Sequence, residues 1–303
     1  MRPSFPVIVN AAAGSGCRDE EIAKLRDAFD AAGAQAHFFA GRRGEELQSM
    51  ARRAASEKPA VIVVVGGDGT INAVASALVG TGIALGIVPL GTFNHFAKDL
   101  HIALDLEAAV RTIVGGRSIS VDVGEVNDRI FLNNSSVGLY PAFVLLRERQ
   151  RKRLGRGKWH AMFWAAITVL RRSPFLDVRL RLDQVEQHRR TPFVFIGNNE
   201  YRMQGFDIGQ RERLDSGWLS VYVTQHCDRS GLIRLALAAL LGRLQQGRDF
   251  IAETAHSLRI ESRHKHLLVA TDGEVTPMQT PLDYRIRAGA LRVLVPAPDP
   301  PDS

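Results

Sequence analysis

Residues 60–72 read AVIVVVGGDGTIN, an apolar and mostly β-branched run that passes directly into a glycine-rich turn. An uninterrupted run of this kind predicts a strand that is buried on both faces, as in a parallel sheet. Residues 70–78 then have the apolar spacing of a helix. Strand, turn and helix together predict one unit of a doubly wound α/β sheet.

The same alternation extends on both sides of this stretch, over about the first 120 residues. Each apolar run that predicts a strand is followed by a segment with helical spacing or by a polar turn. We therefore expect a parallel, doubly wound α/β domain. The expected strands are residues 6–10, 36–40, 60–65 and 84–88, and the expected helices are residues 19–32, 45–56, 70–78 and 106–114.

The pattern changes in the second half of the chain, where turn residues separate many short apolar runs. This spacing predicts a β-rich and mainly antiparallel region. Two helical insertions are expected within it, near residues 159–170 and 231–244. The expected strands are residues 118–126, 129–134, 178–182, 193–197, 218–224, 257–261, 267–271 and 284–287.

The chain has 303 residues, a formal net charge of +7 and 45% apolar residues. This composition excludes a disordered or collagen-like chain, and the length predicts two domains. The only cysteines, Cys17 and Cys227, are far apart, which excludes a disulfide framework and favours a reducing compartment. No run reaches the roughly 18 apolar residues of a membrane span. We therefore expect a soluble, cytoplasmic protein.

The basic charge is concentrated in residues 147–158, RERQRKRLGRGK, which contain seven basic residues and one acid. Residues 159–170, WHAMFWAAITVL, follow and are apolar and aromatic. A basic stretch beside an apolar one suits a membrane surface that carries anionic lipid. Alone, the pattern more often marks a solvated helix end before a core helix. No nucleic acid is expected, because zinc spacing, helix-turn-helix and RNA-binding signatures are absent from the sequence.

The turn Gly66-Gly67-Asp68-Gly69-Thr70 has the composition of a phosphate site. Glycines let a ligand approach the backbone, and the start of a helix offers N–H groups and a positive dipole end. An acid such as Asp68 needs a metal or a proton to face phosphates. The alternative is a tight turn in which Asp68 caps the helix.

Two other turns follow neighbouring strands, at residues 10–16 (NAAAGSG) and 89–97 (PLGTFNHFA). The carboxyl ends of parallel strands meet at one edge of the sheet, where open α/β sheets bind ligands. We therefore expect a ligand site at this edge. In the second half, residues 271–274 (TDGE) read on their own as a hairpin turn.

The segments GGDGTIN (66–72) and PLGTFNHFAKDL (89–100), together with Asp272-Gly273-Glu274, resemble the diacylglycerol kinase catalytic-domain family, which includes bacterial lipid kinases and sphingosine kinases. The similarity is collinear over about residues 5–295. It includes the later segments 122–134 and 214–221. GGDGT also occurs in NAD kinases, whereas the PLGTxNxFA pattern is more specific to the lipid kinases.

The resemblance implies an α/β nucleotide-binding domain at residues 1–121, completed by 288–303. An antiparallel β-sandwich lipid-substrate domain, residues 122–287, would follow it. The implied reaction is ATP-dependent transfer of the γ-phosphoryl group to the hydroxyl of a lipid such as diacylglycerol, with Mg²⁺. Such a kinase would serve lipid metabolism and phospholipid biosynthesis, as a cytoplasmic protein attached peripherally to an anionic membrane.

The resemblance also implies roles for single residues. Glu274 is the first choice for the catalytic base, and Asp272 is the second. Asp68 would act with Mg²⁺ at the phosphates, and Asp122 would belong to a supporting acidic network. The nucleotide would be held by Asn10, Gly66, Gly67, Asp68, Gly69, Thr70, Ile71, Asn72, Thr92 and Asn94.

This chain departs from the family pattern at positions that matter for metal binding. His95 stands where the family commonly has Asp, and Ser216 stands where an Asp would bind a structural Mg²⁺. A hard cation prefers anionic oxygen ligands. Two alternatives for the structural site stay open: Asp215 replaces Ser216 as ligand, or the carbonyls of Arg213 and Trp218 hold a weaker site.

Two other functions stay open from the sequence. An NAD-kinase-like phosphotransferase would explain GGDGT, and a catalytically weakened nucleotide- or lipid-binding sensor would explain His95 and Ser216. The lipid acceptor and the oligomeric state also stay open, a homodimer being one alternative.

Overall fold

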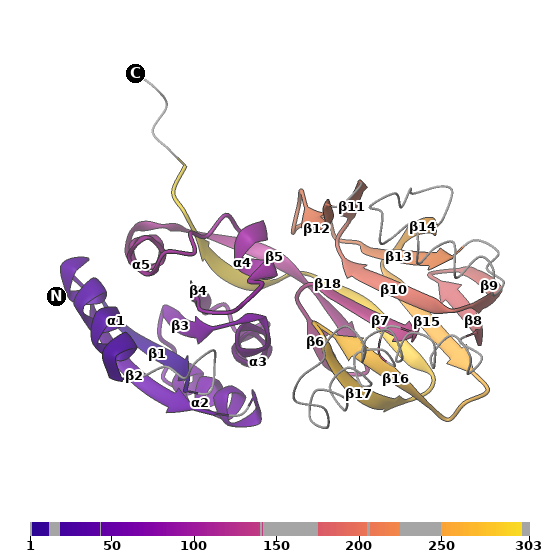
Figure 1. The fold of residues 1–303 in the computed structure, drawn as a ribbon, viewed down its shortest axis with the longest axis horizontal. Helices are drawn as coiled ribbons and strands as arrows, with labels where there is room; N and C mark the ends of the chain where they lie inside the picture. The colour runs from indigo at the N-terminus through magenta and orange to yellow at the C-terminus, as the bar shows by residue number, and fades with distance from the viewer. Residues whose placement is uncertain are drawn as a thin grey trace, which may run out of the picture. The chain divides into compact units, whose positions relative to one another are not determined.

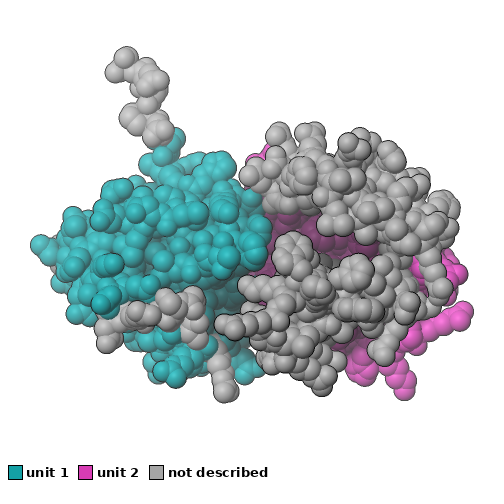
Figure 2. All heavy atoms as spheres, viewed as in Figure 1, with its two compact units in different colours: residues 1–123, 287–303 teal, residues 124–286 magenta. Residues whose placement is uncertain are grey.

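The computed structural model describes residues 2–11, 19–42, 44–139, 141, 175–204, 207–224 and 250–298. The chain forms two compact units, residues 1–123 with 287–303 and residues 124–286, which Figure 2 colours separately. The basic segment 147–158 and the helices expected at 159–170 and 231–244 lie outside the described residues.

The first unit contains parallel strands in the order β2-β1-β3-β4 (Figure 1). Its helices pack in two pairs, α1 with α5 and α2 with α3. This is the arrangement of a doubly wound sheet, whose two faces are covered by different helices. The elements are β1 (Ser4–Asn10), α1 (Asp19–Ala31), β2 (Gln35–Gly41), α2 (Gly44–Ser56), β3 (Val61–Gly66), α3 (Asp68–Leu78), β4 (Ala84–Pro89), α4 (His95–Asp99) and α5 (Leu106–Gly115).

Burial explains why the apolar runs of this unit form its central strands. Val63 and Val64 of β3 are fully buried, as is Leu85 of β4. On the helical side, Leu25 and Phe29 of α1 are fully buried one turn apart. Burying each such side chain contributes about 1.5–3 kcal/mol, so a strand that is apolar on both faces is stable only between two helical layers.

The second unit contains two antiparallel sheets. One sheet has the strand order β14-β13-β10-β7-β16-β17, and the other contains β18, β15, β8 and β9 with β5 and β6 attached. A third, two-stranded sheet joins β11 and β12. The elements are β5 (Arg117–Val126), β6 (Arg129–Phe131), β7 (Asn134–Gly138), β8 (Leu176–Leu182), β9 (Val185–Thr191), β10 (Phe193–Asn198), β11 (Tyr201–Gln204), β12 (Asp207–Arg211), β13 (Leu219–Thr224), β14 (Phe250–Ala255), β15 (Ser257–Ser262), β16 (His266–Thr271), β17 (Glu274–Gln279) and β18 (Leu282–Val295).

The core of this unit lies between the two large sheets. Ile196 and Val221 come from one sheet, and Leu180 and Ile260 come from the other. All four side chains are buried. The predicted α/β domain followed by an antiparallel β-sandwich is therefore confirmed.

Strand β18 takes part in both units. Near its start, Tyr284 pairs with Leu258 of β15 in the second unit. Near its end, Arg292 and Val293 pair in parallel with Ala84 and Leu85 of β4 in the first unit. The last strand of the chain thus completes the sheet that the first strands begin.

The single strand predicted at residues 129–134 is wrong, because the structure has a break there. β6 ends at Phe131 and β7 begins at Asn134. The backbone N–H groups at the break, of Leu132 and Asn133, are bound by the side chain of Asp272 instead of by a neighbouring strand.

Candidate functional site

The glycine-rich turn between β3 and α3 is tied to the end of β1. Asn10, the last residue of β1, donates a hydrogen bond from Nδ2 to Oγ1 of Thr70 at 2.8 Å. A Cβ atom on Gly66 would lie 2.7 Å from the Thr70 side chain, so only glycine fits there. Thr70, near the start of α3, thus contacts the last residue of β1 and the last residue of β3.

The turn after β4 lies against this first turn. A Cβ on Gly91 would lie 2.6 Å from the Cα of Gly67, so the two backbones meet with no room for a side chain. Leu90 also donates its N–H to the carbonyl of Gly66 at 2.9 Å. The expected convergence of the turns at one sheet edge is therefore present for these two turns and for Asn10. Residues 12–16 of the third turn are outside the described residues.

Asn94 fixes the second turn internally. It is buried and has a left-handed backbone with φ of 52°. Its Oδ1 accepts from the N–H of Gly91, and its Nδ2 donates to the carbonyl of Gly91, both at 2.9 Å. Asn94 therefore shapes the turn, while Thr92 in the same turn is exposed to solvent.

Asp68 does not cap α3, so the capping alternative is wrong. The N-cap of α3 is Gly67, and Asp68 is the first helical residue. Its Oδ1 accepts from the N–H of Phe96 in α4 at 3.3 Å. Within the described residues Oδ2 has no hydrogen bond, and it lies beside a helix start whose first N–H groups have no partner inside the helix. An anionic oxygen next to the N–H groups of a helix start has the chemistry to bind a magnesium–nucleotide complex.

The hairpin interpretation of residues 271–274 is confirmed, since β16 and β17 pair through this turn. Asp272 and Gly273 both have positive φ, of 47° and 84°. The Asp272 carboxylate accepts three backbone N–H groups, from Leu132 at 2.8 Å, Asn133 at 2.8 Å and Asn134 at 3.0 Å. It thus holds the break between β6 and β7.

Arg211 holds the same break from its carbonyl side, and sequence reasoning missed it. Its buried guanidinium donates to the carbonyl of Leu132 at 2.7 Å and to Oδ1 of Asn133 at 2.9 Å. Arg211 lies 79 residues from Leu132, so no local pattern indicates the contact. Asp272 and Arg211 together fix the geometry from which the β16–β17 hairpin projects.

Glu274 is the first residue of β17, and its side chain is 60% exposed. Its Oε2 forms an ion pair with Arg129 at 2.7 Å, and Arg129 also donates to Oγ1 of Thr276 at 2.7 Å. Within the described residues Oε1 of Glu274 has no hydrogen bond. Of the two predicted bases, Glu274 is therefore the one with an oxygen available to a substrate hydroxyl.

The loop predicted to hold a structural Mg²⁺ is fixed by an ion pair and by hydrogen bonds. Asp215 is paired with Arg213 at 3.0 Å. Ser216 donates from both its N–H and its hydroxyl to Oδ1 of Asn199, and the Trp218 carbonyl accepts from the Asn199 N–H. The described residues contain no group of three or more His, Cys, Asp and Glu side chains that could hold a metal. Hydrogen bonds with Asn199 thus fix the conformation of this loop.

Asp122 is buried in β5, away from these loops along the chain. Its Oδ1 accepts from the N–H of Gly289 at 2.8 Å, which ties β5 to β18 inside the first unit. Asp122 lies on the first unit with Asn10, Gly66–Asn72, Thr92 and Asn94, whereas Asp272, Glu274 and Arg213–Trp218 lie on the second.

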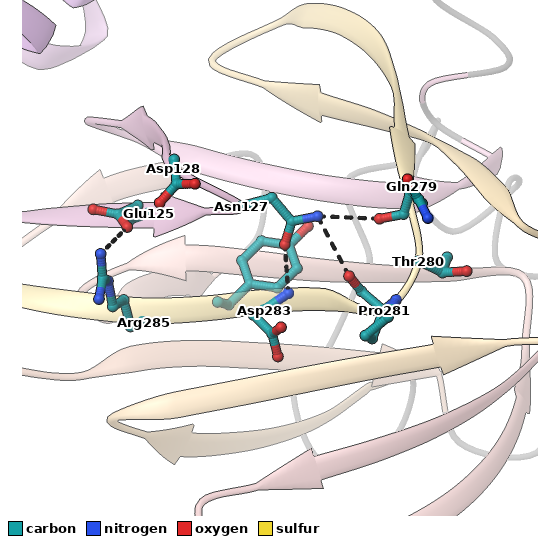
Figure 3. A pocket seen from close by; sticks show the side chains of 9 residues that line it. Glu125, Asn127, Asp128, Gln279, Thr280, Pro281, Asp283 and Arg285 are labelled. Atoms are coloured by element: carbon teal, nitrogen blue, oxygen red, sulfur yellow. Dashed lines mark hydrogen bonds and ion pairs between the residues drawn. The ribbon is translucent and has the colours of Figure 1, made fainter.

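The second unit also contains an open polar cavity of about 470 Å³, beside the β5–β6 and β17–β18 turns (Figure 3). Glu125 and Arg285 form an ion pair on its wall, and the Asn127 side chain binds the backbone of the opposite turn. Burial raises the pKa of Tyr284, whose hydroxyl shares a hydrogen bond with Ser135, so this wall residue stays neutral. No predicted site residue lines this cavity.

Comparisons with known proteins match nearly the whole chain. Residues 4–126 match the diacylglycerol kinase catalytic domain, and residues 146–295 match the YegS C-terminal NAD kinase beta sandwich-like domain. A diacylglycerol kinase of Staphylococcus carnosus is 27% identical over 283 residues, covering 90% of this chain and 89% of that protein. Its counterpart in Staphylococcus aureus is 26% identical, with 90% and 87% covered.

Solved structures give the same fold. A diacylglycerol kinase structure from Bacillus anthracis superposes with a TM-score of 0.70 at 21% identity, covering 96% of each chain. A second structure from that organism gives a TM-score of 0.75 at 24% identity, again with 96% of each chain covered. Likeness at these identities shows a shared architecture.

Proposed function

This chain belongs to the diacylglycerol kinase catalytic-domain family, a family of lipid kinases, and from that premise we propose that it transfers the γ-phosphoryl group of ATP to the hydroxyl of a lipid such as diacylglycerol. The observation that supports this most is the contact of Gly67 with Gly91, where the half-buried backbones of two turns meet beside the start of α3. Such a surface can approach a phosphate chain closely.

Phosphoryl transfer needs positioning, charge neutralisation and one acceptor for the hydroxyl proton. In the proposed reaction, the Gly66–Thr70 turn binds the phosphates and Asp68 orients the magnesium that accompanies ATP. The magnesium, when bound, neutralises charge that develops on the phosphate oxygens. Glu274 accepts the proton of the lipid hydroxyl through Oε1, while Arg129 fixes the orientation of its carboxylate.

The test is ADP release from ATP and Mg²⁺ with mixed micelles of diacylglycerol, phosphatidylglycerol, a sphingoid base or a polyprenol. We expect turnover that depends on one of these lipids. The variant Asp68→Asn should lower that turnover at least tenfold, because it removes a charge that holds the cation. Glu107→Gln, an exposed carboxylate of α5 in the same unit, serves as the matched control and should leave turnover unchanged.

NAD is included as a second acceptor in the same assay, because residues 146–295 match an NAD kinase beta sandwich-like domain. Turnover with NAD and with none of the lipids would replace the proposed function by an NAD-kinase-like one. ATP binding without turnover on any acceptor would instead support the nucleotide-binding sensor, and lipid turnover unaffected by Asp68→Asn would remove Asp68 from the mechanism.

We also propose that the enzyme reaches its lipid as a cytoplasmic protein that binds an anionic membrane peripherally through residues 147–170. Among the described helices, none combines the length and apolar character needed to cross a bilayer. Replacing Arg151, Lys152 and Arg153 with Glu changes the local charge by six. We expect this variant to lose most of its binding to vesicles that contain phosphatidylglycerol, measured by co-sedimentation. Unchanged binding would exclude the segment as the docking surface.

A further inference from the structure

Phe93 is the most exposed large apolar side chain among the described residues, with 64% of its surface in solvent. It lies in the turn after β4, between Thr92 and Asn94, and not on a helix or strand that could pack it. Exposing an aromatic ring to water costs free energy that burial would recover. A ring placed at a ligand-binding edge is therefore a candidate contact for the ligand.

The ring is also oriented by a neighbour. His95 stacks on Phe93 with ring centroids 5.5 Å apart and an interplanar angle of 10°. The two rings are nearly parallel, and most of the Phe93 surface stays in solvent. An aromatic pair in this geometry presents one flat, apolar surface to whatever binds beside it.

The turn that carries Phe93 is rigid on both sides of the ring. Asn94 binds both the N–H and the carbonyl of Gly91, which closes the turn around Thr92 and Phe93. Next along the chain, the N–H of Phe96 binds Asp68. The backbone that carries Phe93 is thus held by hydrogen bonds, which lowers the conformational entropy lost when a ligand stacks on the ring.

The position of the turn relates the ring to the proposed phosphate site. Gly91 contacts Gly67, and Phe93 follows Gly91 by two residues, so their Cα atoms are at most about 7.6 Å apart. A nucleotide with its phosphates at Gly67 extends its ribose and base away from them, and a ring on the adjoining turn is within reach of that base. A flat aromatic base is the part of a nucleotide that such a ring stacks against.

From this arrangement we propose that Phe93, supported by His95, is a nucleotide-specificity residue that stacks on the purine base of ATP. The inference rests on the proposed function and adds a contact to it. Stacking depends on the base and not on the phosphates, so Phe93 sets the preference for a nucleotide over other polyphosphates.

The test measures binding of ATP and of tripolyphosphate, each with Mg²⁺, by isothermal titration calorimetry. We expect Phe93→Leu, which stays apolar but loses the ring, to weaken ATP binding about tenfold, within the range for loss of one base–aromatic stack. Tripolyphosphate, which has no base, should bind Phe93→Leu as it binds the unchanged protein. Phe93→Trp should retain ATP affinity. Leu104→Ala, at another exposed apolar residue of the first unit, is the control.

Equal affinities of the unchanged protein and Phe93→Leu for ATP would overturn the inference while leaving the kinase function standing. Loss of affinity for both ATP and tripolyphosphate would also overturn it, because the substitution would then have disturbed the phosphate-binding turn and not a contact with the base. A raised KM for the lipid with unchanged ATP affinity would assign Phe93 to the acceptor. If the wild-type protein binds no ATP, the proposed function is overturned as well.

Discussion

Glu274→Gln should lower kcat by a factor of about 10² to 10⁴, the range that a positioned general base contributes. The amide keeps the size of the side chain and can still accept one hydrogen bond from Arg129, but it cannot take a proton. The carboxylate is exposed and paired only at the surface, where an ion pair contributes about 0–1 kcal/mol to stability. The thermal midpoint should therefore hardly change.

The measurement is steady-state turnover with the lipid identified in the acceptor assay, together with a thermal melt. Glu186→Gln is the matched control, because Glu186 is also a part-exposed strand carboxylate held by arginines in the second unit. A variant Glu274→Gln that keeps more than a tenth of the kcat would show that another group accepts the proton.

Asp272→Asn should destabilise the second unit by about 3 kcal/mol or more, because hydrogen bonds to a charged group contribute about 1.5–3 kcal/mol each. Asn tolerates the left-handed backbone of this turn, so the change isolates the carboxylate. One of the two oxygens becomes an NH₂ group that faces a backbone N–H donor of Leu132 or Asn133. We expect the thermal midpoint to fall by about 6–12 °C.

The control is Asp128→Asn, which also lies in a left-handed hairpin turn but has an exposed side chain. Its midpoint should stay within about 2 °C of the unchanged protein, as for most surface changes. The kcat of Asp272→Asn, measured well below its melting temperature, separates the two candidate bases. A hundredfold loss in the folded variant would transfer the role of base from Glu274 to Asp272.

The central strands could be predicted from sequence because their burial leaves a plain signal. β3 and β4 are apolar along almost their whole length, and each lies between two neighbouring strands. The strands that the pattern missed include β9, β14 and β17, and each of these ends the strand order of a sheet. An edge strand needs few apolar residues, and β17 even contains Pro277, which only an edge tolerates.

The site residues also fall into two groups, those that the local sequence indicates and those that depend on distant contacts. The glycines at 66, 67 and 91 are visible in the sequence because their turns follow strands that are easy to predict. The contacts of Asp272 with residues 132–134 are not, because they span about 140 residues and exist only after two hairpins have packed together. Those contacts favour a structural role for Asp272, and no local pattern encodes them.

Strand β18 gives the chain an unusual order of assembly. Residues near 292 supply the parallel neighbour of β4, and residues near 284 supply the neighbour of β15. During synthesis, domains at the N-terminus usually fold first, yet here the edge of β4 stays unpaired until residues 292 and 293 have been made. A ribosome that stops at residue 280 would release a chain with open sheet edges in both units. Formation of β18 therefore closes open sheet edges in both units.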